Sequence, residues 1–89
     1  MKEKYLIVTL YKFVHIPNFA SYQPKLLNFC LEKNIKGTIL LADEGINITV
    51  AGTKINIDKF LQFLKSDDRF SDIKHKESFA AEIPFHRMK

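Results

Sequence analysis

The sequence has one cysteine, two arginines and no long apolar run. The single cysteine, Cys30, cannot form an internal disulfide or build a metal cluster alone, so we expect a reducing, cytoplasmic setting. The apolar run at residues 5–10 is too short to cross a membrane and lacks a small-residue cleavage site, so no membrane association is expected. No repeat or low-complexity segment is present, and 89 residues suit a single domain.

The charge is mildly positive, with a formal value of +4 and a pI of about 9.3. Twelve of the fourteen basic residues are lysines, and only Arg69 and Arg87 are arginines. Lysine attracts phosphate as a point charge, whereas arginine supplies the planar fork that reads base edges. The composition therefore permits a polyanionic partner but does not demand one, and a lysine-rich solvated surface is the simpler explanation.

The first half of the chain predicts a strand, a helix and a second strand. Residues 5–16 are rich in β-branched and aromatic side chains with apolar residues on both faces, which is typical of a central strand. A helix is expected from an N-cap at Ser21, with Pro24 in its first turn, to about Lys33. We expect one stripe of the helix to contain four residues at helical spacing, widened by two more: Leu27, Cys30, Leu31 and Asn34, then Leu26 and Phe29. Residues 35–42 predict a buried strand.

The second half predicts a hairpin, a helix and a last strand. A turn at residues 43–45 precedes a strand at 46–51 with clean apolar and polar alternation, so residues 35–51 should form a hairpin. Thr53 can cap a helix whose apolar residues recur at helical spacing, namely Ile57, Phe60, Leu61 and Leu64. Residues 67–70 predict a polar segment that follows this helix, and residues 72–80 predict a last strand with a weaker pattern.

The predicted order is βαββαβ, which specifies an α+β fold. With right-handed crossovers it gives a ferredoxin-like sandwich, a four-stranded antiparallel sheet with two helices on one face. The other sheet face is left without helices, and that face or its rim is where a partner is expected.

Two functions known on this plan are disfavoured by the residues present. An acylphosphatase needs a glycine-rich, arginine-bearing phosphate loop after the first strand, and residues 16–20 contain neither Gly nor Arg. An RNA-recognition motif needs stacking aromatics on its first and third strands. Tyr11 and Phe13 could serve on the first, but residues 46–52 contain no aromatic, Arg or Lys.

Other reactive side chains have plainer explanations. Cys30 lies in an apolar stripe and is expected to be a small buried hydrophobe. The three histidines lack metal-ligand spacing, and no metal site is expected. Asp43 and Glu44 are acids of the kind that turns favour. Asn47 follows the turn, where its amide could order the loop by side-chain hydrogen bonds.

The central segment, residues 36–52 with the sequence KGTILLADEGINITVAG, carries a specific motif. It resembles the G-T-hydrophobic-L-L-A-x-E-G-I-N-G-T-V-A-G stretch of the bacterial rhodanese-domain family of tRNA uridine(34) hydroxylases. Residues 10–14, 76–78 and 83–89 resemble the family's opening strand, its K-x-S and its P-F-x-R-hydrophobic-K in the same order. One departure is Ile48, where the family usually has Gly, and Ile48 favours a regular strand instead.

The resemblance implies a function and a division into parts. Residues 1–83 would be the ferredoxin-like, acylphosphatase-like N-terminal domain, and residues 84–89 would begin the connector to a rhodanese domain that carries the catalytic cysteine. The family forms 5-hydroxyuridine at the wobble position of tRNA with molecular oxygen as co-substrate. The 89 residues would therefore be inactive alone and hold no cofactor or catalytic residue. This domain would assist tRNA binding or cover the rhodanese active site.

Two sets of candidate site residues follow. The turn formed by Glu44, Gly45, Ile46 and Asn47 is expected to face the rhodanese site. Phosphate contacts with tRNA are expected from five basic residues: Lys12, Lys36, Lys74, Lys76 and Arg87. The alternatives are a purely structural domain that supports the rhodanese partner, and a small ligand-sensing ferredoxin-like module.

Overall fold

The computed structural model describes residues 5–81 and has the expected order of elements. They are β1 (Tyr5–Phe13), α1 (Phe19–Glu32), β2 (Lys36–Ala42), β3 (Gly45–Gly52), α2 (Lys54–Lys65), the 3-10 turn η1 (Asp68–Phe70) and β4 (His75–Ala80). The βαββαβ prediction is confirmed, and η1 is an addition between α2 and β4.

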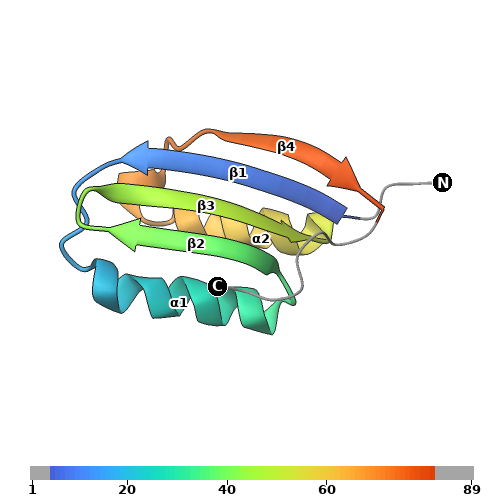
Figure 1. The fold of residues 1–89 in the computed structure, drawn as a ribbon, viewed down its shortest axis with the longest axis horizontal. Coiled ribbons are helices and arrows are strands. Elements are labelled where there is room, and N and C mark those ends of the chain that lie inside the picture. The colour runs from blue at the N-terminus through green and yellow to red at the C-terminus, as the bar shows by residue number, and fades with distance from the viewer. Residues whose placement is uncertain (1–4, 82–89) are drawn as a thin grey trace.

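The strands form one antiparallel sheet in the order β2-β3-β1-β4 (Figure 1). β1 and β3 are central, as the apolar character of both faces of β1 indicated. β2 and β3 form the predicted hairpin, in which Ala42 pairs with Gly45 across a turn of two residues, Asp43 and Glu44. The hairpin turn and the end of β1 lie at the same end of the sheet in Figure 1, so the turn adjoins the loop that leads into α1.

A single core fills the space between the helices and one face of the sheet. The strands contribute alternate residues, such as Leu6, Val8 and Leu10 of β1, which are almost fully buried. Both helices bury side chains in the same cluster, which includes Leu26 of α1 and Phe60 of α2. Each buried Leu or Phe stabilises the fold by roughly 1.5–3 kcal/mol. Both helices therefore cover one face, and the ferredoxin-like sandwich is confirmed.

The start of α1 differs from the prediction. Asn18, not Ser21, is the N-cap, because the Asn18 carbonyl accepts from the backbone N–H groups of Ser21 (3.1 Å) and Tyr22 (2.9 Å). Ser21 lies inside the first turn, where its hydroxyl donates to the same carbonyl at 3.0 Å. Pro24 consequently lies beyond the first turn, where it leaves one helical hydrogen bond unmade.

The buried stripe of α1 is also rotated from the predicted one. Tyr22, Leu26 and Cys30 are buried at a spacing of four, whereas Leu31 is 61% exposed. Leu27 and Phe29 are only partly buried against the core. Asn34 follows the helix with a positive φ of 56° and is exposed, so it ends the helix instead of joining the stripe.

Two strands are shorter than predicted, while α2 follows its prediction. β1 ends at Phe13 and β4 starts at His75, because the backbone at 14–16 bonds to the hairpin turn and residues 68–73 form tight turns. Thr53 caps α2 by accepting from the Asn56 N–H at 3.3 Å. The four residues predicted from helical spacing are buried. No helix within residues 5–81 is long and apolar enough to cross a membrane.

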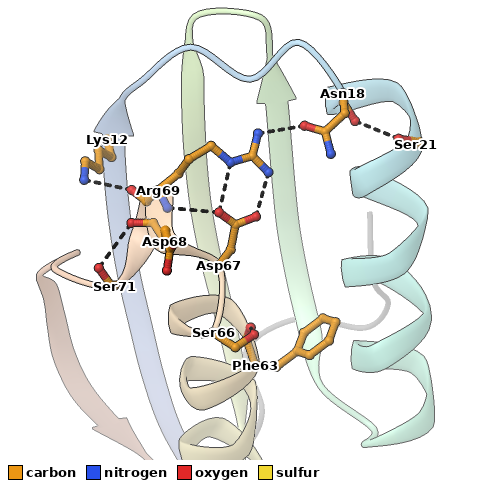
Figure 2. A network of polar contacts seen from close by, with 9 residues as sticks. All are labelled: Lys12, Asn18, Ser21, Phe63, Ser66, Asp67, Asp68, Arg69 and Ser71. Atoms are coloured by element: carbon orange, nitrogen blue, oxygen red, sulfur yellow. Dashed lines mark hydrogen bonds and ion pairs between the residues drawn. The ribbon is translucent and has the colours of Figure 1, made fainter.

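Arg69 of η1 ties the end of α2 to the start of α1 (Figure 2). Its guanidinium donates to both carboxylate oxygens of Asp67, at 2.9 and 2.6 Å, and to Asn18 Oδ1 at 2.7 Å. It also lies over the rings of Tyr22 and Phe70, at 5.4 and 5.5 Å. Bidentate pairing of this kind holds the pKa of Asp67 below its usual value. Arg69 therefore has a structural role.

Candidate nucleic-acid interface

The face of the sheet without helices carries an unusual group of exposed apolar side chains. Strand alternation directs Tyr11 and Phe13 of β1 and Leu40 of β2 to this face, and they are 68%, 84% and 58% exposed. Asn47 of β3 lies between two of them, since it pairs with Tyr11 on one side and Leu40 on the other. These four residues, which we call the distal patch, lie on the half of the face nearest the hairpin turn.

The two aromatic rings of the distal patch contact each other edge to face. Their centroids are 6.1 Å apart and their planes meet at 72°. They are two residues apart on one strand, and Phe13 pairs with Gly45, which offers no side chain to cover the ring. A Cβ at Gly45 would meet the Lys12 carbonyl oxygen at 2.5 Å, so the backbone itself requires glycine there. The lack of a neighbouring side chain leaves the Phe13 ring open to solvent.

Two hollows lie on either side of Tyr11. The first has a volume of about 250 Å³, and its lining includes Phe13, Leu40, Ala42 and Asn47 together with Tyr11. The second, of about 590 Å³, lies toward β4 and is lined by residues that include Thr9, Lys74 and Lys76. The first is mainly apolar, and its lining also includes Lys12, Glu44 and Asn47. The second is lined by three lysines, Lys12, Lys74 and Lys76, and by the acid Asp72.

The strands direct charge of one sign to this face. Of the side chains in β1–β4 that alternation directs there, Lys36 and Lys76 are the charged ones, and none is acidic. Lys74 lies just before β4. Within residues 5–81, none of these three lysines forms an ion pair. Glu77 points to the helix side, where it contacts His75 at 2.7 Å.

Of the five predicted phosphate contacts, Lys36, Lys74 and Lys76 thus lie on or beside one face. Lys12 lies on the helix side, where its Nζ contacts Asp72 Oδ1 at 2.6 Å and donates to the Arg69 carbonyl at 2.8 Å. Its charge is already compensated by Asp72. Arg87 lies outside the described residues, as do the predicted domain boundary at residue 83 and the connector 84–89.

The predicted turn of Glu44, Gly45, Ile46 and Asn47 divides between the two sides of the sheet. Ile46 is buried in the core, Gly45 and Asn47 face the uncovered side, and Glu44 is in the turn. The turn is ordered by backbone bonds from the β1–α1 loop, in which Val14 N–H donates to the Glu44 carbonyl (3.1 Å) and Ile16 N–H to that of Asp43 (2.7 Å). The Asn47 amide makes no hydrogen bond within residues 5–81, so it does not order the loop as predicted.

The same two backbone bonds bear on the acylphosphatase alternative. A phosphate cradle needs free N–H groups in the loop after the first strand, and two N–H groups of this loop already donate to the hairpin turn. Arg69 reaches the loop at Asn18, where its Nη1 donates to the side chain, and its Nε and Nη2 donate to Asp67. The loop therefore serves to fix the turn.

Cys30 lies within the core with no exposed surface. Burial raises the pKa of its thiol to about 12, so the thiolate that a nucleophile requires is scarce at neutral pH. The interpretation of Cys30 as a small buried hydrophobe is confirmed. Within residues 5–81, no group of three or more His, Cys, Asp or Glu side chains could hold a metal ion.

Sequence reasoning overlooked Leu40. The apolar run Ile39-Leu40-Leu41 predicts a buried strand, yet Leu40 is exposed while Ile39 is buried. The signal was available in the hairpin register, because Leu40 pairs with the outward-facing Asn47.

Comparison with known proteins shows the family of this chain. Residues 5–89 match the model of the family described as the UPF0176 acylphosphatase like domain. The chain belongs to this family. A relative from Ehrlichia chaffeensis named tRNA uridine(34) hydroxylase is 48% identical over 86 residues, covering 96% of this chain and 31% of the relative. A relative of the same name from Albidiferax ferrireducens is 45% identical over 86 residues, covering 97% of this chain and 27% of the relative.

The family resemblance noted from residues 36–52 is thereby confirmed. The chain spans less than a third of the length of these relatives. Among solved structures, full-length HypF in its phosphate- and nucleotide-bound form matches all of this chain and 12% of its own, with a TM-score of 0.70 and 17% identity. At that identity the match supports the fold alone.

Proposed function

We propose that this chain is the N-terminal domain of an enzyme that hydroxylates the wobble uridine of tRNA, and that it helps to bind the tRNA. The relatives named tRNA uridine(34) hydroxylase, 45–48% identical over nearly the whole chain, are the main support. The three lysines on or beside the uncovered face supply the positive surface that such a role needs.

In this proposal the chemistry takes place outside residues 5–81. The buried thiol of Cys30 is not suited to it, and a cysteine of a rhodanese domain, joined through residues 84–89, would take the catalytic role. Molecular oxygen would be the co-substrate, and 5-hydroxyuridine the product. The cytoplasm, where tRNA is modified, would be the site of action.

The uncovered face would contact the tRNA backbone through Lys36, Lys74 and Lys76, with Arg87 adding a fourth contact. The hairpin turn at the end of this face, residues 44–47, would point toward the rhodanese site and so deliver the bound RNA to it. Each phosphate contact releases counterions, so affinity should fall steeply as salt is raised.

The test uses the whole protein and a matched pair of triple variants. Lys36→Gln, Lys74→Gln and Lys76→Gln together should weaken tRNA binding and reduce the slope of log affinity against log salt by about 2–3. The control is Lys25→Gln, Lys59→Gln and Lys65→Gln, which removes the same charge from the helices. Equal losses in both variants, or none in either, would reject specific binding by this face.

A cellular measurement tests the reaction. Cells that lack the protein should contain less 5-hydroxyuridine at position 34 of tRNA, as measured by mass spectrometry of digested tRNA. The intact gene should restore the modification, and the gene for the face variant should restore it only partly. Unchanged 5-hydroxyuridine in cells without the protein would reject the proposed activity.

A second candidate is a structural domain that supports the rhodanese partner without touching RNA. The exposed apolar side chains of the distal patch favour it, because such patches also mark protein interfaces. In that case the lysine variants would bind tRNA normally, and substitution of the patch would lower the melting temperature of the whole protein.

A further inference from the structure

We propose that the two hollows beside Tyr11 bind one unstacked nucleotide of a single-stranded RNA segment, with its base in the first hollow and its phosphate in the second. This inference rests on the proposed function and deepens it, because it assigns base recognition to the distal patch and phosphate recognition to the lysines beside it. An RNA-recognition motif would stack bases on aromatics of two strands. Here both aromatics belong to β1, and β3 supplies Asn47 instead.

The first hollow has the chemistry of a base site. The Phe13 ring is the most exposed large hydrophobic side chain of the described residues and offers a face on which a flat base can stack. Tyr11 and Leu40 add apolar walls, and a volume of about 250 Å³ lies below the 300–1,000 Å³ usual for drug-sized ligands. A hollow of this size and lining suits one planar ring system.

Asn47 gives the first hollow a polar contact suited to a base edge. Its carboxamide has a donor and an acceptor side by side, the pattern that pairs with a base edge in a bidentate way. The amide lies between Tyr11 and Leu40 in the register and makes no hydrogen bond within residues 5–81. It can therefore bond to a base without breaking a contact of the fold.

The second hollow has the chemistry of a phosphate site. Lys74 and Lys76 line it, and neither forms an ion pair with a described residue. Asp72, which also lines it, is paired with Lys12 at 2.6 Å. Tyr11 lines both hollows, so a nucleotide whose base occupies the first can extend its sugar and phosphate past the Tyr11 ring into the second.

The charge of the face favours RNA over a protein partner. The cores of protein interfaces are depleted of lysine relative to the rest of the surface. This face carries lysines and no acidic side chain from its strands, and aromatic groups interleaved with positive charge are typical of proteins that bind single-stranded nucleic acid.

The experiment measures binding of the whole protein to a labelled single-stranded oligoribonucleotide and to the same sequence in a duplex. Phe13→Ala should weaken single-strand binding roughly tenfold and leave duplex binding unchanged, whereas Phe13→Trp should retain it. Asn47→Ala should reduce the preference among homopolymers. The control is Leu31→Ala with Ile55→Ala, which shortens two other exposed apolar residues, on the helices. The side chain of Phe13 is exposed, so the melting temperature should not change.

The outcomes separate this inference from the proposed function. Loss of tRNA binding in the lysine variants with normal single-strand binding in Phe13→Ala would overturn the nucleotide site and leave the proposed function standing. Equal weakening of single-strand and duplex binding would overturn it too, because stacking requires a free base. Unchanged RNA binding with a lower melting temperature of the whole protein in Phe13→Ala would show that the patch is covered by protein, and would also overturn it.

Discussion

Lys12 and Asp72 are 60 residues apart in the sequence, and their side chains form an ion pair with an Nζ–Oδ1 distance of 2.6 Å. The same ammonium group donates to the Arg69 carbonyl at 2.8 Å. Lys12 therefore joins the central strand β1 to the segment that enters the edge strand β4. Because Lys74 and Lys76 follow directly after this segment, the contact also positions two lysines of the proposed RNA-binding face.

We expect Lys12→Met to lower the free energy of unfolding by about 1–2 kcal/mol, because a charge-assisted hydrogen bond to a part-buried carbonyl is lost. Asp72→Asn should cost less, since the Asp72 side chain is largely exposed. Urea unfolding monitored by circular dichroism measures both. A Lys12→Met protein as stable as the parent would show that the contacts of Lys12 with Asp72 and the Arg69 carbonyl do not stabilise the fold.

Stability should decrease in acid through two aspartates. The ammonium of Lys12 lowers the pKa of Asp72, and the guanidinium of Arg69 lowers that of Asp67. An unfolded aspartate has a pKa of about 3.9, so each contribution is present above that value and is lost as the pH falls through the lower folded pKa.

The change below pH 4 should therefore be smaller in Asp67→Asn, measured as unfolding free energy at a series of pH values. The matched control is Asp68→Asn, because the Asp68 carboxylate forms no ion pair within residues 5–81. An identical pH dependence in both variants would contradict the role given to the Asp67–Arg69 pair.

Gly37→Ala should destabilise the protein by about 2 kcal/mol or more. Gly37 has a φ of +138°, and a Cβ there would overlap the backbone carbonyl oxygen of Thr49 on β3. Gly52→Ala is the comparison, because its Cβ would meet only side chains, the nearest being Ile35 Cγ1 at 3.2 Å. In thermal melting, Gly37→Ala should have a clearly lower melting temperature than Gly52→Ala. Equal melting temperatures would contradict the requirement for glycine at position 37 of β2.

Cys30→Ala should keep the proposed tRNA binding and hydroxylation of the whole protein, because the thiol is buried and its pKa is raised to about 12. Alkylation of Cys30 at neutral pH should proceed only as fast as the protein opens, which mass spectrometry can follow with and without denaturant. A folded Cys30→Ala protein without activity would place the thiol in the reaction.

The sequence was sufficient to predict the fold because its patterns are local. The period-two alternation of Ile46, Ile48 and Val50 and the helical spacing of Ile57, Phe60 and Leu64 each predict one element, and both were confirmed. The N-cap of α1 was missed because Asn18 caps through its backbone carbonyl, without a side-chain bond that a sequence pattern would reveal. Ile48 lies in the regular strand β3 with its side chain in the core.

The site was harder to predict because its contacts are distant in the sequence. Nothing near Lys12 indicates that its charge is paired with Asp72, and nothing near Arg69 indicates that it bonds to Asn18. The exposure of Phe13 likewise depends on Gly45, which lies opposite it on another strand. The sequence indicates which lysines are candidates for phosphate contacts. Only the pairing register of the strands shows which of these lysines lie on the same face of the sheet.

Ultraviolet crosslinking of the whole protein to tRNA, followed by mass spectrometry of the crosslinked peptides, tests the central claim most directly. Our account predicts crosslinks at Tyr11 and Phe13 and in the segments 36–51 and 74–78, on the face without helices. Crosslinks confined to α1 and α2, or absent from residues 5–81 altogether, would contradict it.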